Sequence, residues 1–505
     1  MSSSEAPHLQ TIGLDDAAEP LVVAVDIGSG STRCGLYDAH ARPIERRTFT
    51  AEHSFTETAD GAVEIDADQV VAEVSTVLSD SVRGLPPGSV KGVAMDTFAS
   101  SLVCVNTAGD ALTPCLTYAD SRSAPQLAKL RELVDEARSQ QRTGTRLHTS
   151  YHPPRLLWLR EEHPDIFAAT KRFVSLGEYV YAKLAGTEAA ATSTMAWAGI
   201  LDRHSMELDD ELLAAVGVDR SRFAPVVDPD RSITDVRCDV AQRWPALAGA
   251  AWLPAVPDGY ASNLGVGADE PSTAALSAGT SGAIRVIVDG APEELPPGLW
   301  AYRVSSSQSI VGGALNDVGR VVDWLENTLA PVDRESLRLA LSGPARPGIP
   351  LVLPFLTGER STGWAGDARA VLTGVSSSTT PLEVWRGAAE GVAVSYGRVF
   401  EQLRRANPRL ERLVASGGVA SSYPGLMDVV AQGIGFPVQM VDVHHVTMRG
   451  AAMLALAVST DAPAAELPRS EAVVPRPAER QYFDDLAARF AGVYDALIAD
   501  GRARV

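Results

Sequence analysis

The chain has 505 residues, of which 45% are hydrophobic and 21% charged, and its formal net charge is −19. This length allows two or three domains with real cores, and the composition is that of a globular protein. The negative charge argues against nucleic acid or an anionic membrane as a main partner, because both need clustered positive charge. No apolar run could span a bilayer and the start has no signal-peptide pattern, so we expect a cytoplasmic protein with a flexible tail over residues 1–20.

The first motif is a small-residue turn between two apolar stretches. Residues 21–27 and 32–37 predict strands, and the turn Gly28-Ser-Gly-Ser-Thr32 leaves backbone N–H groups free for an anion. The turn lacks the third glycine of a dinucleotide fingerprint and leads into a strand instead of a helix. A P-loop is excluded because no lysine in the chain follows a glycine.

The rest of the first half alternates strands and helices, which indicates an α/β fold. The spacing predicts a turn over 38–43, helices over 67–78 and 126–138 and from 156, strands over 90–95 and from 113, and a polar loop over 142–154. The strand that begins near residue 113 ends in a charged loop, the place where α/β sheets bind ligands. The polar loop could bind a hydroxylated ligand through His148 and Tyr151, and a capped surface loop is the open alternative.

Near the middle of the chain a lone carboxylate precedes a second small-residue turn. Asp258 lies in the stretch 258–265, which predicts a Gly-rich turn, and Gly279-Thr-Ser-Gly282 separates strands predicted over 274–277 and 283–288. This strand, turn, strand pattern repeats that of residues 21–37, so we expect a duplicated architecture. A base and a phosphate cradle are then neighbours, although each stretch alone is compatible with an ordinary surface turn.

Beyond the exposed loop over 289–298, glycines again mark the boundaries between strands and helices. Residues 310–325 and 412–430 each predict a strand, a Gly-rich turn and a helix, whose N-terminus suits a phosphate group. Residues 351–360 predict a charged loop, and a long helix follows. We expect four charged residues here to be structural ion partners and not catalysts: Glu359, Arg360, Arg386 and Glu390.

Taken together, these motifs resemble the FGGY family of carbohydrate kinases over about residues 22–456. The resemblance implies two ribonuclease-H-like domains of the actin and hexokinase type with a cleft between them. It implies a sugar-binding domain over 21–265 and an ATP-binding domain over 266–505. ATP would be the co-substrate and Asp258 the catalytic base, and Asp26 would bind Mg²⁺ through water.

The resemblance also implies two sets of contacts. The phosphates and the nucleoside would be bound by Gly28, Ser31, Thr32, Arg33, Gly279, Thr280, Ser281, Gly319, Asp323, Gly417, Gly418 and Ser422. The sugar would be bound by Ser100, Asp120, Arg122, His148, Tyr151 and Asp258.

Within the family, the strings Thr280-Ser-Gly-Ala-Ile-Arg285 and Tyr118-Ala-Asp-Ser-Arg-Ser123 are similar to those of gluconokinase-like members. We therefore predict D-gluconate as the substrate, with Arg122 and Arg146 as partners of its carboxylate. Xylulokinase or another pentulose or hexose kinase is the alternative. An actin-like ATPase would not need Asp258, and a non-catalytic sugar sensor would have lost it. The expected partners are the sugar and ATP, and a homodimer is an open assembly state.

Overall fold

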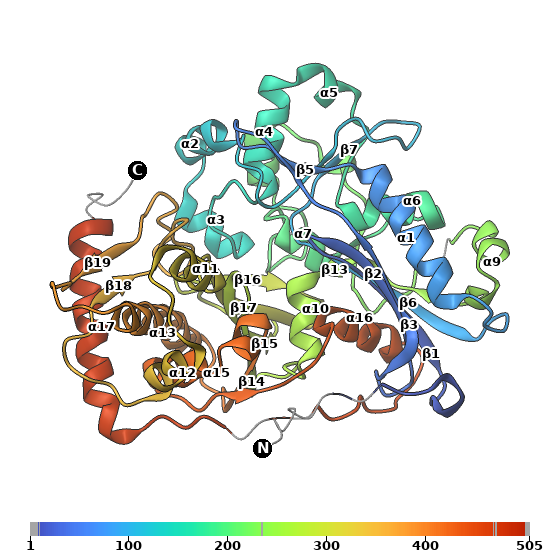
Figure 1. The fold of residues 1–505 in the computed structure, drawn as a ribbon. Coiled ribbons are helices and arrows are strands. Elements are labelled where there is room, and N and C mark those ends of the chain that lie inside the picture. Colours follow the sequence, from blue (N-terminus) through green and yellow to red (C-terminus); the bar gives the residue numbers. More distant parts are fainter. Residues whose placement is uncertain (1–8, 10, 234–235, 468, 470–471, 500–505) are drawn as a thin grey trace.

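The computed structural model describes residues 9, 11–233, 236–467, 469 and 472–499, and shows two α/β lobes side by side (Figure 1). The sheet of the first lobe has the strand order β12-β6-β1-β2-β3, with β13 also paired to β6. Its strands are β1 (Leu21–Ile27), β2 (Ser31–Tyr37), β3 (Pro43–Glu52), β6 (Val90–Thr97), β12 (Ala251–Trp252) and β13 (Val256–Pro257). The sheet of the second lobe has the order β16-β17-β15-β14-β20-β21. Its strands are β14 (Thr273–Ala278), β15 (Gly282–Asp289), β16 (Trp300–Arg303), β17 (Gln308–Leu315), β20 (Arg412–Ser416) and β21 (Gln439–Met440).

Smaller sheets and many helices surround these two sheets. The small sheets are formed by β4 (Thr56–Glu57), β5 (Val63–Ile65) and β8 (Cys115–Leu116), by β7 (Val103–Val105) and β9 (Arg172–Val174), by β10 (Ala190–Ala191) and β11 (Val226–Val227), and by β18 (Leu351–Leu353) and β19 (Val371–Thr373). The helices of the first half are α1 (Ala67–Val82), α2 (Ala124–Leu133), α3 (Glu136–Thr143), α4 (His152–Glu162), α5 (Pro164–Ala169), α6 (Leu176–Ala185), α7 (Thr192–Trp197), α8 (Asp210–Val216), α9 (Asp239–Arg243) and α10 (Asp258–Gly265). Those of the second half are α11 (Gly319–Thr328), α12 (Arg334–Ser342), α13 (Pro381–Ala406), α14 (Gly418–Ser422), α15 (Pro424–Ile434), α16 (Val446–Ala457) and α17 (Arg480–Tyr494).

The two main sheets share one topology, as the repeated sequence pattern predicts. In the first sheet β1 is antiparallel to β2 and parallel to β6. In the second sheet β14 is antiparallel to β15 and parallel to β20. Each sheet therefore places a tight turn, between β1 and β2 or between β14 and β15, at the carboxyl end of a central strand, where α/β sheets bind ligands.

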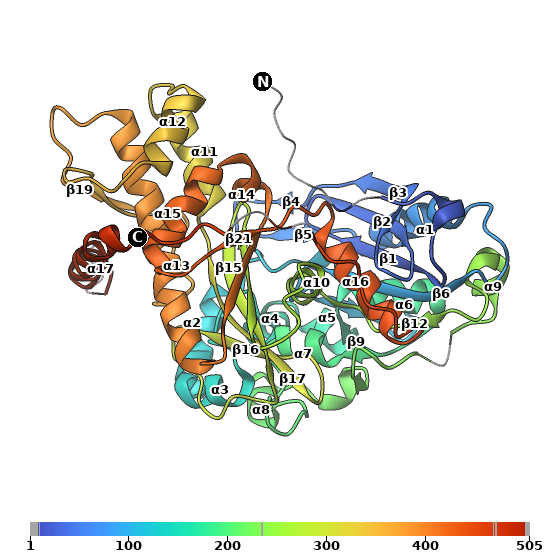
Figure 2. The same ribbon diagram turned by 90° about the horizontal axis from the view of Figure 1, so that it is seen from below.

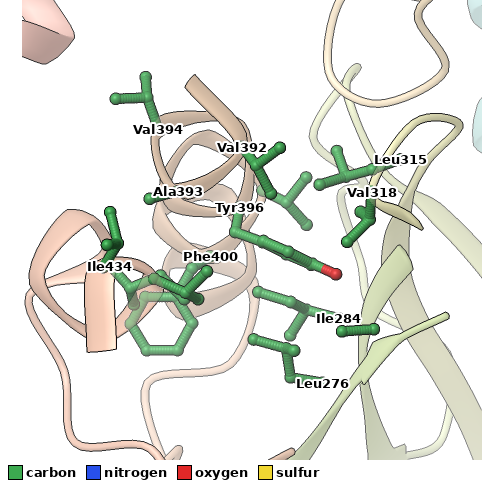
Figure 3. Close-up of a cluster of buried hydrophobic side chains, with 14 of the residues drawn as sticks. Leu276, Ile284, Leu315, Val318, Val392, Ala393, Val394, Tyr396, Phe400 and Ile434 are labelled. Carbon is green, nitrogen blue, oxygen red and sulfur yellow. The ribbon is translucent and has the colours of Figure 1, made fainter. Parts of the chain in front are cut away.

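The core of the second lobe supports its turn from below. Helix α13 packs along the sheet, and its Tyr396 lies among buried aliphatic side chains with its hydroxyl directed toward the strands (Figure 3). That hydroxyl donates a hydrogen bond of 2.8 Å to the carbonyl of Ser277 on β14. A Cβ at Gly282 would lie 2.1 Å from the same hydroxyl, so a glycine is needed for this close approach.

The two lobes are joined by α10 and α16, which lie side by side between them in both views (Figures 1 and 2). Their backbones cross closely because two glycines lie at the contact: a Cβ at Gly450 would lie 1.8 Å from the carbonyl oxygen of Ala261, and one at Gly265 would lie 2.0 Å from that of Val446. Helix α16 comes late in the chain, yet it packs against β1 and β6 of the first sheet. The first lobe thus contains a helix from the C-terminal part of the sequence.

The lobes also meet at β16. The amide of Ala301 donates to the carbonyl of Gly144 at 2.9 Å, and the Gln140 side chain donates to the carbonyl of Leu299 at 2.9 Å. These bonds hold the aromatic side chains of β16 against the first lobe.

Three local expectations from the sequence are wrong. Residues 258–265 form helix α10 and not a turn, because α10 is packed against α16. The helix predicted over 126–138 is two helices, since Val134 is extended and the Asp135 side chain caps α3 by accepting from the amide of Arg138. Helix α4 begins at His152 and not at residue 156, because prolines are tolerated in a first helical turn.

Of the chain before β1, the structure describes residues 9 and 11–20. Residues 1–8 and 10, within the predicted tail, lie outside the described residues. The amide of Ile12 donates to the carbonyl of Pro43 at 3.0 Å, and Leu14–Asp16 form a short 3-10 helix. This part of residues 1–20 therefore lies against β3.

Candidate functional site

Three carboxylates meet where β1, β6 and β13 end. Asp26 on β1 is the register partner of Asp96 on β6, and Asp258 directly follows β13, which is paired to the same end of β6. Adjacent strands lie about 4.8 Å apart, so the three backbones are close neighbours. Asp26 and Asp96 are buried, whereas Asp258 is partly exposed to a cavity.

This crowding changes the proton affinity of two of the three groups. Burial raises the pKa of Asp96 well above its usual range, and the charges of Asp26 and Asp258 act in the same direction. Burial also raises the pKa of Asp258 to about 6, while nearby Arg285 opposes the rise. Asp258 is therefore largely ionised at neutral pH and can accept a proton there.

The first turn, residues 28–32, is closed by a hydrogen bond of 3.0 Å from the amide of Gly28 to the carbonyl of Ser31. The amides of Ser29 and Gly30 have no intramolecular acceptor among the described residues. The side chain of Thr32 points away from them, because its hydroxyl donates to Glu73 on α1 at 2.8 Å. The open face of this turn is therefore made of backbone N–H groups, which suit a phosphate.

The second turn, residues 279–281, is closed in the same way by the amide of Gly279 and the carbonyl of Ser281 at 2.9 Å. The start of α11 rests on it, since the amide of Gly319 donates to the carbonyl of Gly279 at 2.9 Å. Gly417, before α14, has φ +115°, and a Cβ there would lie 2.4 Å from the carbonyl oxygen of Ala278. The structure thus brings together the glycines that the sequence assigned to the phosphate end of a nucleotide.

The remaining predicted nucleotide residues are spread around this second turn. Asp323 lies on the exposed face of α11 and is near enough to Tyr423 to help raise the pKa of that phenol, after burial and Glu326. Ser422 is exposed at the end of α14. Between α11, α13 and α15 lies an apolar recess whose lining includes Val318, Trp385 and Tyr423.

A cavity of about 200 Å³ lies between the two lobes and includes residues of both turns. The first lobe contributes Ser29, Phe98, Ala99, Ser100, Tyr118, Ser150, Tyr151, Trp197, Asp258 and Gly259. The second lobe contributes Ser281, Arg285, Trp300, Tyr302, Ala314 and Arg360. A carboxylate, two guanidinium groups and both turns therefore line one cavity.

Aromatic rings form one wall of this cavity. The rings of Trp197, Tyr302 and Trp300 are stacked, with centroid separations of 4.0 and 4.5 Å. The hydroxyls of Tyr302 and Tyr151 share a hydrogen bond of 2.7 Å. Such a wall offers flat apolar surface together with hydroxyl groups at its edge.

The predicted sugar-binding residues divide into two groups. Ser100, Tyr151 and Asp258 line the cavity. His148 lies behind Tyr151, and burial lowers its pKa to about 3, with Arg360 acting in the same direction, so its ring is neutral. Asp120 is not among the residues that line the cavity.

The two arginines predicted to bind a carboxylate are engaged elsewhere. Arg122 forms ion pairs with Asp120 at 2.6 Å and with Glu64 at 2.8 Å, and Arg146 pairs with Glu136 at 3.2 Å. The structure therefore does not place Arg122 or Arg146 in the cavity lining, because each has an acidic partner within its own lobe.

Three charged residues of the site were missed by the sequence reasoning. Asp96 is the carboxylate that directly follows the predicted strand 90–95, and charge at a strand end was the signal for it. Arg285 lies on β15 inside the string that indicated a gluconokinase. Arg360 was expected to be a structural ion partner, and it lines the cavity instead.

The other three predicted ion partners do form ion pairs. Arg386 pairs with Glu390 at 2.7 Å, and Arg398 pairs with Glu359 at 3.0 Å. These pairs are largely buried and lie within the second lobe, so they support the fold around α13.

The acidic residues at β1 and β6 fit a hard cation held through water. Neither carboxylate oxygen of Asp96 has a hydrogen-bond partner in the described structure. Within residues 9, 11–233, 236–467, 469 and 472–499, no group of three or more His, Cys, Asp or Glu side chains could hold a metal ion by itself. Any cation here would therefore take most of its ligands from phosphate and water, as Mg²⁺ commonly does.

Comparison with known proteins decides the family. The model of the N-terminal domain of the FGGY family of carbohydrate kinases matches residues 21–265, and that of the C-terminal domain matches residues 274–459. The chain belongs to the FGGY family of carbohydrate kinases. It is thus a carbohydrate kinase that uses ATP, and the resemblance inferred from the motifs is confirmed, as is the two-domain fold of the actin and hexokinase type.

Individual FGGY kinases are similar to this one at low identity. A gluconokinase of Bacillus subtilis is 24% identical over 419 residues, which are 79% of this chain and 80% of that protein. A xylulose kinase of Streptomyces coelicolor is 27% identical over 467 residues, 90% of this chain and 91% of its own. The crystal structure of a gluconate kinase from Lactobacillus acidophilus has a TM-score of 0.87 at 22% identity, covering 95% of this chain and 98% of that one, which shows the shared fold. In the described part of this kinase no helix is long and apolar enough to cross a membrane.

Proposed function

We propose that this kinase transfers the γ-phosphoryl group of ATP to a hydroxyl group of D-gluconate. The observation that carries the proposal is that Arg285 and Arg360 line the same cavity as Asp258. Burial lowers the pKa of Arg285, and the charge of Arg360 acts in the same direction. A bound carboxylate would compensate these two cations, and guanidinium groups bind carboxylates in a bidentate manner.

The remaining lining suits the polyol part of such a substrate. The stacked rings of Trp197, Tyr302 and Trp300 offer a flat surface for C–H groups. Ser100 and Tyr151 supply hydroxyl groups on the opposite lobe. A polyol acid would therefore contact both lobes at once.

Asp258 is the proposed general base. As the substrate oxygen bonds to the γ-phosphorus and the bond to the bridging oxygen of ADP breaks, the hydroxyl proton passes to the Asp258 carboxylate. Because burial raises the pKa of Asp258 to about 6, protonation below that value removes the base. We expect kcat/KM for the sugar acid to fall as the pH is lowered through about 6.

The two turns divide the triphosphate between them in this proposal. The amides of the first turn face the transferred group, and Gly279, Thr280 and Ser281 hold the other phosphates, next to Gly319 and Gly417. Asp26 would hold Mg²⁺ through water, with Asp96 beside it. The metal neutralises phosphate charge, which matters in a site without lysine.

A pair of substrates that differ in one group tests the proposal. D-gluconate and D-glucitol differ only in that a carboxylate replaces a hydroxymethyl group. We expect kcat/KM to be about 10–100-fold higher for gluconate, because a hydrogen bond to a charged group is worth about 1.5–3 kcal/mol. The preference should largely disappear in Arg285→Met and Arg360→Met, whereas Arg122→Met should keep it. Equal rates for both substrates would refute the carboxylate site.

D-xylulose is the second candidate, because the Streptomyces coelicolor xylulose kinase matches a larger share of this chain at 27% identity. A neutral pentulose would bring no carboxylate to Arg285 and Arg360. A kcat/KM clearly higher for xylulose than for gluconate would decide for this alternative.

A further inference from the structure

A buried histidine lies directly behind the first turn. His53 follows β3, and its side chain is fully buried. One ring nitrogen, Nδ1, lies 2.9 Å from Oε2 of Glu73, and the other, Nε2, lies 2.9 Å from the carbonyl oxygen of Gly28. The backbone amide of His53 donates to the carbonyl of Gly30 at 3.1 Å. One residue therefore holds two carbonyl groups of the turn.

The partners of the ring decide its protonation state. A backbone carbonyl can only accept a hydrogen bond, so Nε2 must donate. Both oxygens of Glu73 already accept, Oε1 from the Gln69 amide at 2.8 Å and Oε2 from the Thr32 hydroxyl at 2.8 Å. A carboxylate on Glu73 accepts all three of these hydrogen bonds, with Nδ1 of His53 as the third donor. A histidine that donates from both nitrogens is an imidazolium.

An aromatic ring and charged side chains of several elements surround His53 and the turn. Phe55 is stacked against the ring at a centroid distance of 6.5 Å. Asp26 on β1 and Arg33 on β2 face one another at 3.4 Å, and the exposed Glu52 precedes His53 in the chain. Glu73, on α1, is the ionised side chain that contacts the ring.

We propose that His53 is a positioning residue that acts as a buried imidazolium, fixing and polarising the turn that receives the transferred phosphoryl group. The carbonyl of Gly28 and the amide of Ser29 belong to one peptide group. A charged donor on that carbonyl makes the amide a stronger donor, since hydrogen bonds in a chain polarise one another. The inference rests on the proposed function for its kinetic consequence and on geometry alone for the protonation state.

The consequence of losing the proton follows from the same three bonds. A neutral ring can donate from only one nitrogen, so either the bond to Glu73 or the bond to Gly28 is lost. The turn is then released on one side, and the polarisation of the amide of Ser29 is lost or reduced. Either loss should weaken the contact of the turn with the transferred phosphoryl group.

The protonation state can be measured without any activity. In the full-length protein labelled with ¹⁵N-histidine, we expect both ring nitrogens of His53 to carry a proton at pH 7.5. The signal is assigned by its absence in His53→Gln. In Glu73→Gln, which removes the carboxylate but keeps the shape, the second ring proton should be absent at the same pH. A singly protonated His53 ring in the wild type at pH 7.5 would overturn the inference.

Kinetics test the role of the clamp, which is the pair of hydrogen bonds from His53 to the carbonyl groups of Gly28 and Gly30. At saturating sugar, kcat/KM for Mg-ATP should fall about 10–100-fold in His53→Gln, because a charge-assisted hydrogen bond is lost. At saturating ATP, KM for the sugar should change little. Glu73→Gln, which removes the carboxylate partner of the ring, should show a loss in the same constant. The exposed His204, changed to Gln, is the matched control and should match the wild type in both constants.

The outcomes separate this inference from the proposed function. If no sugar acid is phosphorylated but the His53 ring is doubly protonated, the function fails and the clamp stands. If the kinase is active and both variants keep the wild-type kcat/KM for Mg-ATP, the clamp plays no part in catalysis. Melting temperatures of all variants report any general loss of folding, which would lower the rate for both substrates alike.

Discussion

The two turns lie on the same strand frame but are supported by different chemistry. Behind the first turn are the hydrogen-bonded side chains of His53 and Glu73. Behind the second turn are the Tyr396 hydroxyl and close backbone contacts at Gly319 and Gly417. Hydrogen bonds from side chains support the first turn. The second turn needs glycines, because a Cβ at Gly319 or Gly417 would collide with the backbone. A shared topology therefore fixes where a turn lies, while its neighbours decide what disturbs it.

The residues two positions before each turn also differ in charge. Asp26 lies two residues before Gly28, and Ser277 lies two residues before Gly279. Their register partners on the adjacent parallel strands are Asp96 and Ser416. The first lobe thus has an acidic pair where the second has two serines. The proposed Mg²⁺ site therefore lies on the side of the first turn.

The largest expected effect comes from a change that spares both turns. Asp258→Asn keeps the size of the side chain but cannot accept the hydroxyl proton, so kcat should fall by about 10²–10⁴. ATP affinity should stay the same, because both turns are intact. Turnover, ATP Kd and Tm are measured on one preparation, with the exposed Asp269→Asn as control. Near-normal turnover would remove Asp258 from the mechanism.

Asp26→Asn removes one carboxylate from the acidic pair of the first lobe. Loss of one charge next to a metal held through water should lower activity by about 10–100-fold at limiting Mg²⁺, as is typical for outer ligands. Added Mg²⁺ should restore much of that activity. A Mg²⁺ titration at fixed ATP measures this. A loss that no Mg²⁺ concentration relieves would mean that Asp26 shapes the turn and does not serve the metal.

One added methyl group tests the close packing behind the second turn. In Gly417→Ala a Cβ would lie 2.4 Å from the carbonyl oxygen of Ala278, at φ +115°. Strain of about 1–3 kcal/mol should weaken ATP binding roughly tenfold. The next residue is the control, because a Cβ at Gly418 meets nothing within 4 Å. Calorimetry with ATP on both variants measures the difference, and equal affinities would show that the second turn tolerates added volume.

The smallest effect is expected at Tyr396. Tyr396→Phe removes one hydrogen bond to Ser277 and should cost about 1 kcal/mol of stability, which lowers Tm by about 2–4 °C. ATP affinity should fall slightly with it, because the bond lies below the second turn. Tyr482→Phe removes a hydroxyl that donates to Glu390 at 2.8 Å and serves as the control. If both variants lose the same stability and neither changes ATP affinity, Tyr396 supports the core and not the turn.

The sequence by itself determined the elements whose signals are local. Strands β1, β2, β14 and β15 and the turns between them follow from apolar runs interrupted by small residues. The apolar spacing over 67–78 predicted helix α1, and a long helix was expected where α13 lies; in the structure Asp66 and Thr380 cap these two helices. These features depend on backbone preferences within a few residues, so they can be read without knowing any distant partner.

Tertiary structure alone decided which charges are free. Arg122 and Arg360 both stand in charged loops in the sequence, yet Arg122 is held by Asp120 and Glu64, while Arg360 lines the cavity. The same holds for Asp258, whose stretch became a helix because α16, almost 200 residues later, packs against it. Whether a charge is paired within the fold or faces a ligand depends on neighbours brought together by packing, and the local sequence does not contain that information.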